Sequence, residues 1–171
     1  MAHDRFQPWI VVLSMKQAFP ASWQGAGYAA IGLHNPKNRK NVGGVLRAAF
    51  CFGAALVAIA GHRYRVQSTD TADAYRHLPL LQVDDLHDVI PYDCIPVAVE
   101  RRSDAIPLPD YEHPERAFYI FGPEDGDLGP NVLNWCRDLV YIPSHHSINL
   151  AAVVNIVLYD RMAKHGLSSP H

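Results

Sequence analysis

The chain has 171 residues, of which 49% are hydrophobic and 19% are charged, a composition ordinary for a soluble globular protein. This length favours a single domain with a substantial core. The formal net charge of −2 excludes the strongly basic proteins that bind nucleic acid non-specifically, so contact with a polyanion would need a local basic patch. The sequence shows neither a bilayer-length hydrophobic run nor a secretory signal pattern, so we expect a cytoplasmic protein without a membrane partner.

Five short hydrophobic runs follow an N-terminal arm of residues 1–27, which contains one possible extra strand at 9–13. The runs cover residues 28–33, 55–60, 94–99, 117–121 and 139–143. Hydrophobic strands separated by helix-like segments predict an α/β protein with a mostly parallel sheet, flanked by helices on both faces. Ligands of such sheets bind beyond the carboxyl ends of the strands. The unusual loops after 28–33, 117–121 and 139–143 are therefore the candidates for a functional site.

The first loop, HNPKNRKNVGGVLRAAFCFGA (34–54), runs into a predicted helix for which Asn41 is a suitable N-cap. The spacing predicts a buried stripe made of Val42, Leu46, Ala49, Phe50 and Gly53. Arg47 lies off that stripe on the side of Gly43 and Gly44, so its guanidinium can lie over bare backbone and reach the loop. The alternative is a surface ion pair for Arg47, with glycines that accommodate a neighbouring strand.

The second loop, FGPEDGDLGPN (121–131), has three glycines directly after a predicted buried strand. Glycines let the backbone approach a ligand closely. The acidic residues Glu124, Asp125 and Asp127 disfavour a phosphate site, and the lysine of a P-loop is absent. The spacing of an EF-hand calcium loop is absent as well. The loop therefore favours a neutral or cationic ligand, with a plain surface turn as the alternative.

The third loop, IPSHHSINLAAVVNIVLYD (142–160), passes from a strand into a helix through Ser147 and Asn149, both suitable capping residues. The helix is hydrophobic on more than one face, which predicts burial against its own sheet and against a second subunit. His145 and His146 are adjacent, without an evident third ligand, and the three cysteines are far apart. We therefore expect no metal site and no disulfide framework.

Taken in order, the three loops resemble the signature motifs of the SpoU/TrmH branch of the SPOUT RNA methyltransferases. The first motif is matched by Asn41, Gly43, Arg47, Phe52 and Gly53. The second is matched by Phe121, Gly122, Pro123, Glu124 and Gly126. The third is matched by Ile142, Pro143, Ser147, Ile148, Asn149 and Leu150. The chain departs from the family in the sequence GDLG after Glu124 and in a third loop shortened to residues 144–146.

The resemblance implies a methyltransferase domain at 28–165, a C-terminal tail at 166–171 and a SPOUT fold with a C-terminal trefoil knot. In this family the knot loops hold S-adenosylmethionine. The cofactor-binding residues that this implies are Val99, Glu100, Gly122, Glu124, Gly126, Ile142, Ser147 and Leu150. The acidic second loop agrees with a cofactor that carries a sulfonium and an ammonium group. The family also implies a homodimer with sites at its interface, in agreement with the doubly hydrophobic final helix.

The reaction that the resemblance implies is methyl transfer to a ribose 2′-hydroxyl of RNA. We expect no separate RNA-binding domain in a chain of this length, which favours tRNA over rRNA. Arg47 corresponds to the family's catalytic arginine, and because a guanidinium has a pKa above about 12 we favour positioning over proton removal. Asn41, Ser147 and Asn149 would orient the hydroxyl and Arg47. The basic residues expected to contact RNA are Lys37, Arg39, Lys40, Arg63 and Arg65.

Three alternatives stay open. The first is a catalytically inactive knotted RNA-binding protein, which the short third loop favours and the presence of Asn41 and Arg47 disfavours. The second is a SPOUT methyltransferase that modifies a ring nitrogen of guanine, whose motifs differ from those above. The third is a dehydrogenase, which lacks support because no G-x-G-x-x-G sequence follows a predicted strand.

Overall fold

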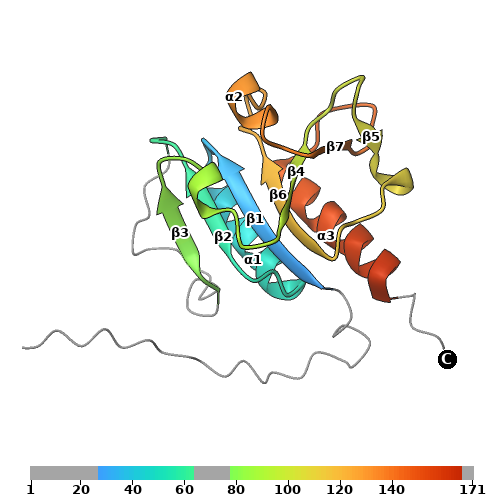
Figure 1. The fold of residues 1–171 in the computed structure, drawn as a ribbon. Helices are drawn as coiled ribbons and strands as arrows, with labels where there is room; N and C mark the ends of the chain where they lie inside the picture. The colour runs from blue at the N-terminus through green and yellow to red at the C-terminus, as the bar shows by residue number, and fades with distance from the viewer. Residues whose placement is uncertain (1–26, 64–77, 167–171) are drawn as a thin grey trace, which may run out of the picture.

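The computed structural model describes residues 27–63 and 78–166, which build one sheet with helices packed against it (Figure 1). Seven strands form this sheet in the order β3-β2-β1-β6-β4-β7-β5. The strands are β1 (Tyr28–His34), β2 (Val57–Ala60), β3 (Leu80–Val83), β4 (Ile95–Val99), β5 (Ile106–Pro107), β6 (Arg116–Phe121) and β7 (Asp138–Tyr141). Every pairing between them is parallel. The prediction of an α/β protein with a parallel sheet is therefore confirmed.

The edge strands β3 and β5 differ from the strands predicted as hydrophobic runs. β3 is partly exposed along its length, and β5 has only two residues and pairs with β7 alone. Neither forms the continuous buried run that marks β1, β2 and β6, and neither was predicted as a strand. The predicted arm at 1–27 with its strand at 9–13, and nearly all of the tail at 166–171, lie outside the described residues.

Helices cover the two faces of the sheet unequally. The α-helices are α1 (Arg39–Cys51), α2 (Pro130–Leu133) and α3 (Leu150–Gly166), and the short 3₁₀ helices are η3 (His87–Val89) and η4 (Leu108–Asp110). α1 and α3 lie side by side against one face (Figure 1), and their buried residues join alternate residues of β1 in one core cluster. The other face packs against Leu86, Leu128 and Val132, which come from α2 and from loops. None of the helices within the described ranges is long and hydrophobic enough to span a bilayer.

The structure corrects the prediction that Asn41 is the N-cap of α1. The helix is capped by Asn38, whose side chain accepts a hydrogen bond of 2.9 Å from the Lys40 N–H. Asn41 therefore lies inside the first turn, and its amide is available for contacts with other loops. The predicted buried stripe is confirmed at Val42, Leu46 and Ala49, whereas Phe50 is half-buried and Gly53 is exposed beyond the helix end. Val45 and Ala48 complete the buried face.

Gly44 marks a close approach between α1 and α3. A Cβ atom built on Gly44 would lie 2.7 Å from the Cβ atom of Ala151. Real Cβ atoms do not come so near each other, so a side chain here would force the two helices apart. The close approach at this glycine is thus made by α3 and not by the Arg47 guanidinium, which supports the alternative of a glycine that accommodates a neighbouring element.

We expect Gly44→Ala to lower the free energy of unfolding by about 1–2 kcal/mol, although alanine favours a helix interior by about 1 kcal/mol, because overpacking outweighs that gain. Urea denaturation measures the change. Ala151→Gly is the matched partner for a double-mutant cycle, because it removes the atom that the new methyl group would meet. A coupling energy of zero between the two substitutions would contradict this account of Gly44.

The C-terminal half of α3 is fixed by Arg161, which is only 3% exposed. Its guanidinium donates hydrogen bonds to the carbonyls of Pro114 and Glu115, just before β6, and to the hydroxyl of Tyr119. His113 lies between Tyr119 and Asp160 with both ring nitrogens engaged. Burial lowers the pKa of His113 to about 4, so the ring is neutral at physiological pH. This network ties α3 to the amino end of β6.

Candidate functional site

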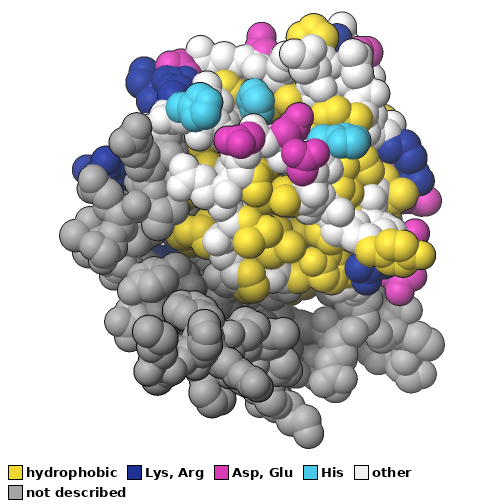
Figure 2. Space-filling model, turned by 60° about the vertical axis from the view of Figure 1, so that its left-hand side comes forward, with side chains coloured by type: hydrophobic (Ala, Val, Ile, Leu, Met, Phe, Trp, Pro, Cys, Tyr) yellow, Lys and Arg dark blue, Asp and Glu magenta, His cyan; other side chains and the backbone are white. Residues whose placement is uncertain are grey.

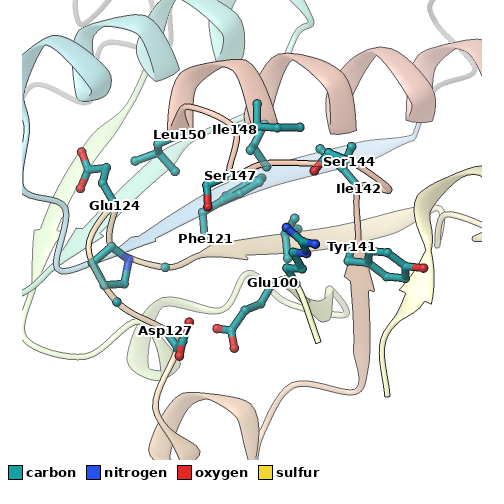
Figure 3. A pocket seen from close by; sticks show the side chains of 16 residues that line it. Glu100, Phe121, Glu124, Asp127, Tyr141, Ile142, Ser144, Ser147, Ile148 and Leu150 are labelled. Atoms are coloured by element: carbon teal, nitrogen blue, oxygen red, sulfur yellow. The ribbon is translucent and has the colours of Figure 1, made fainter. Parts of the chain in front are cut away.

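A pocket opens at the carboxyl ends of β6, β4 and β7, which are neighbours in the sheet (Figure 3). Their ends are level, because Val99 pairs with both Phe121 and Val140. The loops that follow these strands and the first turns of α3 form the walls. The pocket lies beyond the carboxyl ends of buried strands, as predicted, and the second and third loops line it. The first loop (34–54) contributes no lining residue, and the segment at the end of β4 takes its place.

All eight residues that the sequence nominated for cofactor binding line this pocket. They are Val99, Glu100, Gly122, Glu124, Gly126, Ile142, Ser147 and Leu150. Eight further residues line the pocket. Phe121, Pro123, Asp127 and Ile148 belong to the loops and motifs quoted from the sequence but were not nominated for binding, and Arg101, Tyr141, Ser144 and Val153 were missed. Each of these lies within three residues of a nominated position, so the signal that could have found them was the full length of each loop. The binding roles themselves stay predictions.

A chain of hydrogen bonds joins the three loops. The Asn149 side chain donates through Nδ2 to Asn41 Oδ1 at 2.8 Å, and Asn41 donates through Nδ2 to Glu124 Oε1 at 2.8 Å. Glu124 also accepts from the backbone N–H groups of Lys37 at 2.8 Å and Asn38 at 3.1 Å. Burial acts to raise the pKa of Glu124, but these hydrogen bonds outweigh it and hold the pKa below its usual value. Three segments distant in sequence are therefore fixed relative to one another at the rim of the pocket.

Asn149 also caps α3, because its Oδ1 atom accepts from the N–H of Ala151 at 2.9 Å. The prediction that Ser147 shares this capping role is wrong, since the helix begins at Leu150 and Ser147 is an exposed residue at the pocket wall. One asparagine thus both starts the helix and holds Asn41.

The acidic second loop was expected to direct its charges toward a ligand, but Asp125 instead binds other residues of the protein. Asp125 forms ion pairs with Lys37 at 3.1 Å and with Arg63 at 2.8 Å, and Arg63 donates to both carboxylate oxygens. These hydrogen bonds hold the pKa of Asp125 well below its usual range. Two of the cations nominated for RNA contact are therefore already paired with a carboxylate, although the Lys37 side chain remains 61% exposed.

Arg47 is exposed on α1 and lies off the buried stripe, as predicted. It is not one of the pocket-lining residues, and the described part of the chain offers it no hydrogen bond or ion pair. Arg39 and Lys40 are exposed in the first turn of the same helix. Arg65 lies outside the described residues. The structure therefore brings Asn41 and Asn149 together and leaves the Arg47 guanidinium on the surface.

Glu100 is the most buried carboxylate of the pocket wall. Its backbone N–H donates to the Val140 carbonyl at 2.9 Å, and its side chain accepts a hydrogen bond from the Leu128 N–H. Burial raises the pKa of Glu100, and the negative charge of Asp127 adds to the increase. Across residues 27–63 and 78–166, no three histidine, cysteine or acidic side chains are grouped to hold a metal ion.

Comparison with known proteins identifies the family of this chain. A family model described as the SpoU rRNA Methylase family matches residues 28–159, which is most of the chain. The chain belongs to the SpoU rRNA methylase family. No curated protein sequence matches it significantly.

Solved structures show the same SpoU fold. The SpoU methyltransferase AviRb from Streptomyces viridochromogenes, in complex with the cofactor AdoMet, has a TM-score of 0.73 at 20% identity, over 80% of this chain and 60% of AviRb. The structure that describes the 2-OH methylation of C/U34 on tRNA has a TM-score of 0.71 at 23% identity, over 82% of this chain and 97% of that one. The A. aeolicus TrmH/SpoU tRNA modifying enzyme has a TM-score of 0.71 at 15% identity, over 84% of this chain and 79% of that enzyme's chain.

These similarities establish the fold of this SpoU-family chain, which spans about 60% of the length of AviRb. They agree with the α/β prediction and with the assignment to the SPOUT methyltransferases. The threading of the trefoil knot itself stays a prediction.

Proposed function

We propose that this chain is an S-adenosylmethionine-dependent RNA methyltransferase that modifies a ribose 2′-hydroxyl, with tRNA favoured over rRNA as the substrate. The observation that carries the proposal is the hydrogen-bonded chain Asn149–Asn41–Glu124, which joins the three motif loops beside a pocket lined by all the nominated cofactor residues. The AdoMet complex of AviRb and the tRNA 2-OH methylation structure, both of the same fold, support it.

The pocket suits the proposed cofactor by the chemistry of its walls. Ile142, Leu150 and Val99 supply hydrophobic surface for a nucleoside, and Gly122 leaves the backbone accessible. Glu100 and Asp127 supply negative charge for a cationic ligand. When bound, S-adenosylmethionine supplies a methyl group on a positively charged sulfur, so the protein needs only to align a nucleophile and assist the loss of its proton.

Arg47 is the residue that we expect to position the RNA. Its guanidinium carries a permanent charge and five N–H donors, and the described residues leave these donors available for a phosphate and a ribose oxygen. Asn41 cannot turn freely, because its amide is held by Glu124 on one side and Asn149 on the other. The proposed division of work is that Arg47 binds the substrate while Asn41, Asn149 and Ser147 define the position of the hydroxyl.

RNA contact is proposed along the edge of the sheet that carries the pocket. Arg39 and Lys40 are exposed there, and Lys37 and Arg63 follow the neighbouring strands. Figure 2 shows the side of the molecule where β3 lies, with basic side chains at its margins and hydrophobic, acidic and histidine side chains in its middle. The described residues on that side form no continuous basic surface for a phosphate backbone.

A homodimer through α3 is the second part of the proposal. Ile156 and Tyr159 lie on one face of α3 and are 37% and 59% exposed, while Val154, Val157 and Leu158 are buried against the protein's own core. A helix that is hydrophobic on both faces needs a second partner, and an isologous contact between two copies supplies it. This contact lies on the helix whose first turn lines the pocket.

The dimer proposal predicts that Tyr159→Arg shifts the protein toward the monomer, because a charge would be buried in the contact. Sedimentation velocity ultracentrifugation measures the change in mass. Tyr92→Arg is the matched control, since Tyr92 is 92% exposed and lies away from α3, and it should leave the mass unchanged. A wild-type protein that sediments as a monomer at micromolar concentration would refute the dimer.

The function is tested by incubating the protein with methyl-labelled S-adenosylmethionine and total RNA, followed by digestion to nucleosides. We expect the label in a 2′-O-methylated nucleoside of the tRNA fraction. Label in a guanine base would instead support the base methyltransferase. Cofactor binding by calorimetry without incorporation into RNA, or no cofactor binding at all, would support the inactive RNA-binding protein.

A further inference from the structure

Two carboxylates stand together on one side of the pocket. Glu100 follows β4 and Asp127 lies in the loop after β6, and Figure 3 shows their carboxylate groups next to each other. The negative charge of Asp127 acts to raise the pKa of the Glu100 carboxyl, and the positive charge of Arg102 acts to lower it. Two like charges in one wall cost energy unless a cation offsets them. Arg102 offsets part of this charge, and Arg101 is a further cation of the pocket wall.

The protein itself holds this negative charge in place. The Glu100 side chain is bound by the N–H of Leu128, and Leu128 is 2% exposed in the core, so the carboxylate cannot swing into solvent without losing that contact. Arg102, a nearby cation, is engaged by Asp104 at 2.9 Å. Over residues 27–63 and 78–166, neither Glu100 nor Asp127 takes part in an ion pair.

A metal ion is a poor match for this charge. Two carboxylates are fewer ligands than calcium requires, and the described residues offer no third histidine, cysteine or acidic group beside them. A small organic cation fits the pocket better, because it can pair with the carboxylates and also contact the hydrophobic lining residues.

Methyl transfer changes the charge of the cofactor by one unit. In the proposed reaction the methyl carbon forms a bond to the ribose 2′-oxygen, which loses its proton. The electrons of the broken S–CH₃ bond stay on sulfur, so the sulfonium becomes a neutral thioether. The amino and carboxylate groups of the molecule do not change. An anionic pocket wall therefore attracts the reactant more strongly than the product.

We propose that Glu100 and Asp127 are specificity-determining residues that make the pocket bind the sulfonium cofactor more tightly than its thioether product. The inference rests on the proposed function and adds to it a means of releasing the product. For a charge several ångströms away at a partly exposed site, one charge unit changes affinity by roughly three- to ten-fold.

The test is calorimetric titration of the full chain with three ligands: S-adenosylmethionine, S-adenosylhomocysteine and sinefungin. Sinefungin keeps a positive charge near the position of the sulfur and has no methyl group to transfer. In the wild type we expect S-adenosylmethionine and sinefungin to bind more tightly than S-adenosylhomocysteine. Asp127→Asn should weaken the two cationic ligands by about three- to ten-fold and S-adenosylhomocysteine by less than about two-fold.

Glu100→Gln should act in the same direction and keeps an oxygen to accept the Leu128 N–H, so it separates charge from structure. Asp88→Asn is the matched control, because Asp88 is an exposed acidic residue of η3 and does not line the pocket. It should change none of the three affinities. Thermal unfolding of each variant without ligand checks that the fold is intact.

Equal weakening of all three ligands would overturn the inference, because the carboxylates would then serve the amino group that the ligands share. Unchanged affinities in both variants would overturn it as well. A failure of the proposed function looks different, since the wild type would then bind none of the three ligands.

Discussion

Arg47→Lys should lower the rate of methyl transfer to RNA by at least about 100-fold while the Kd for S-adenosylmethionine stays within about two-fold. The side chain is exposed and does not line the pocket, so cofactor affinity should not depend on it. A lysine keeps the charge but not the planar, bidentate set of donors, and misplacing a nucleophile by about 1 Å costs about this factor. Single-turnover transfer to tRNA and calorimetric titration of the cofactor measure the two quantities.

Lys40→Ala is the control for Arg47, because Lys40 is an exposed cation on the same helix, less than two turns earlier. It should raise the KM for RNA modestly, with a dependence on salt, and leave the single-turnover rate at saturating RNA unchanged. Full activity in Arg47→Lys would refute the positioning role. Loss of both cofactor binding and transfer in that variant would indicate a folding defect, which circular dichroism would detect.

The location of the site was predictable from the sequence because its signals are local. Each of the three loops follows a buried hydrophobic run, and parallel strands bring their carboxyl ends to one edge whatever their order in the sheet. The eight nominated pocket residues meet for this reason. The identity of the expected cofactor came from the resemblance to a family, because hydrophobic patterns and loop composition do not specify a cofactor.

The contacts within the site were not predictable, because they depend on how the loops face one another. Glu124 was expected to face a ligand as part of an acidic loop, yet its carboxylate binds the backbone of the first loop and the amide of Asn41. Asp125 is likewise engaged by Lys37 and Arg63. The composition of the loop does not show whether a carboxylate faces solvent, a ligand or another part of the protein. Only the folded structure shows that both carboxylates bind residues of the protein itself.

The sequence also did not determine which residue caps α1 or what role its glycine plays. Asn38 and Asn41 are equally good N-caps by residue type, and the choice between them is made by tertiary contacts that employ Asn41 elsewhere. The same holds for Gly44, whose bare backbone serves the packing of α3. Local propensity narrows these choices to a few residues and packing decides among them.

Arg161→Leu should lower the free energy of unfolding by about 3–5 kcal/mol, the largest stability change that we expect from a single substitution in this chain. The guanidinium is buried and satisfies the carbonyls of Pro114 and Glu115 at 2.6 and 2.7 Å. Leucine is hydrophobic but has no donors, so these carbonyls would be left buried without partners. Equilibrium denaturation in urea, followed by far-UV circular dichroism, measures the loss.

Two further variants separate the hydrogen bonds of Arg161 from other effects of the substitution. Arg161→Lys retains a charge and some of the donors, so its loss should be smaller than that of leucine. Arg137→Ala removes an arginine that is 62% exposed and pairs with Asp138 at the surface, and it should cost less than about 1 kcal/mol. If Arg161→Leu proved no more destabilising than Arg137→Ala, the buried guanidinium would not be what fixes α3 to the amino end of β6. The end of α3 that lines the pocket should then be stable without it, and the alignment of the site with the sheet would depend on the Asn149 cap and on the packing of α3 against α1 and β1.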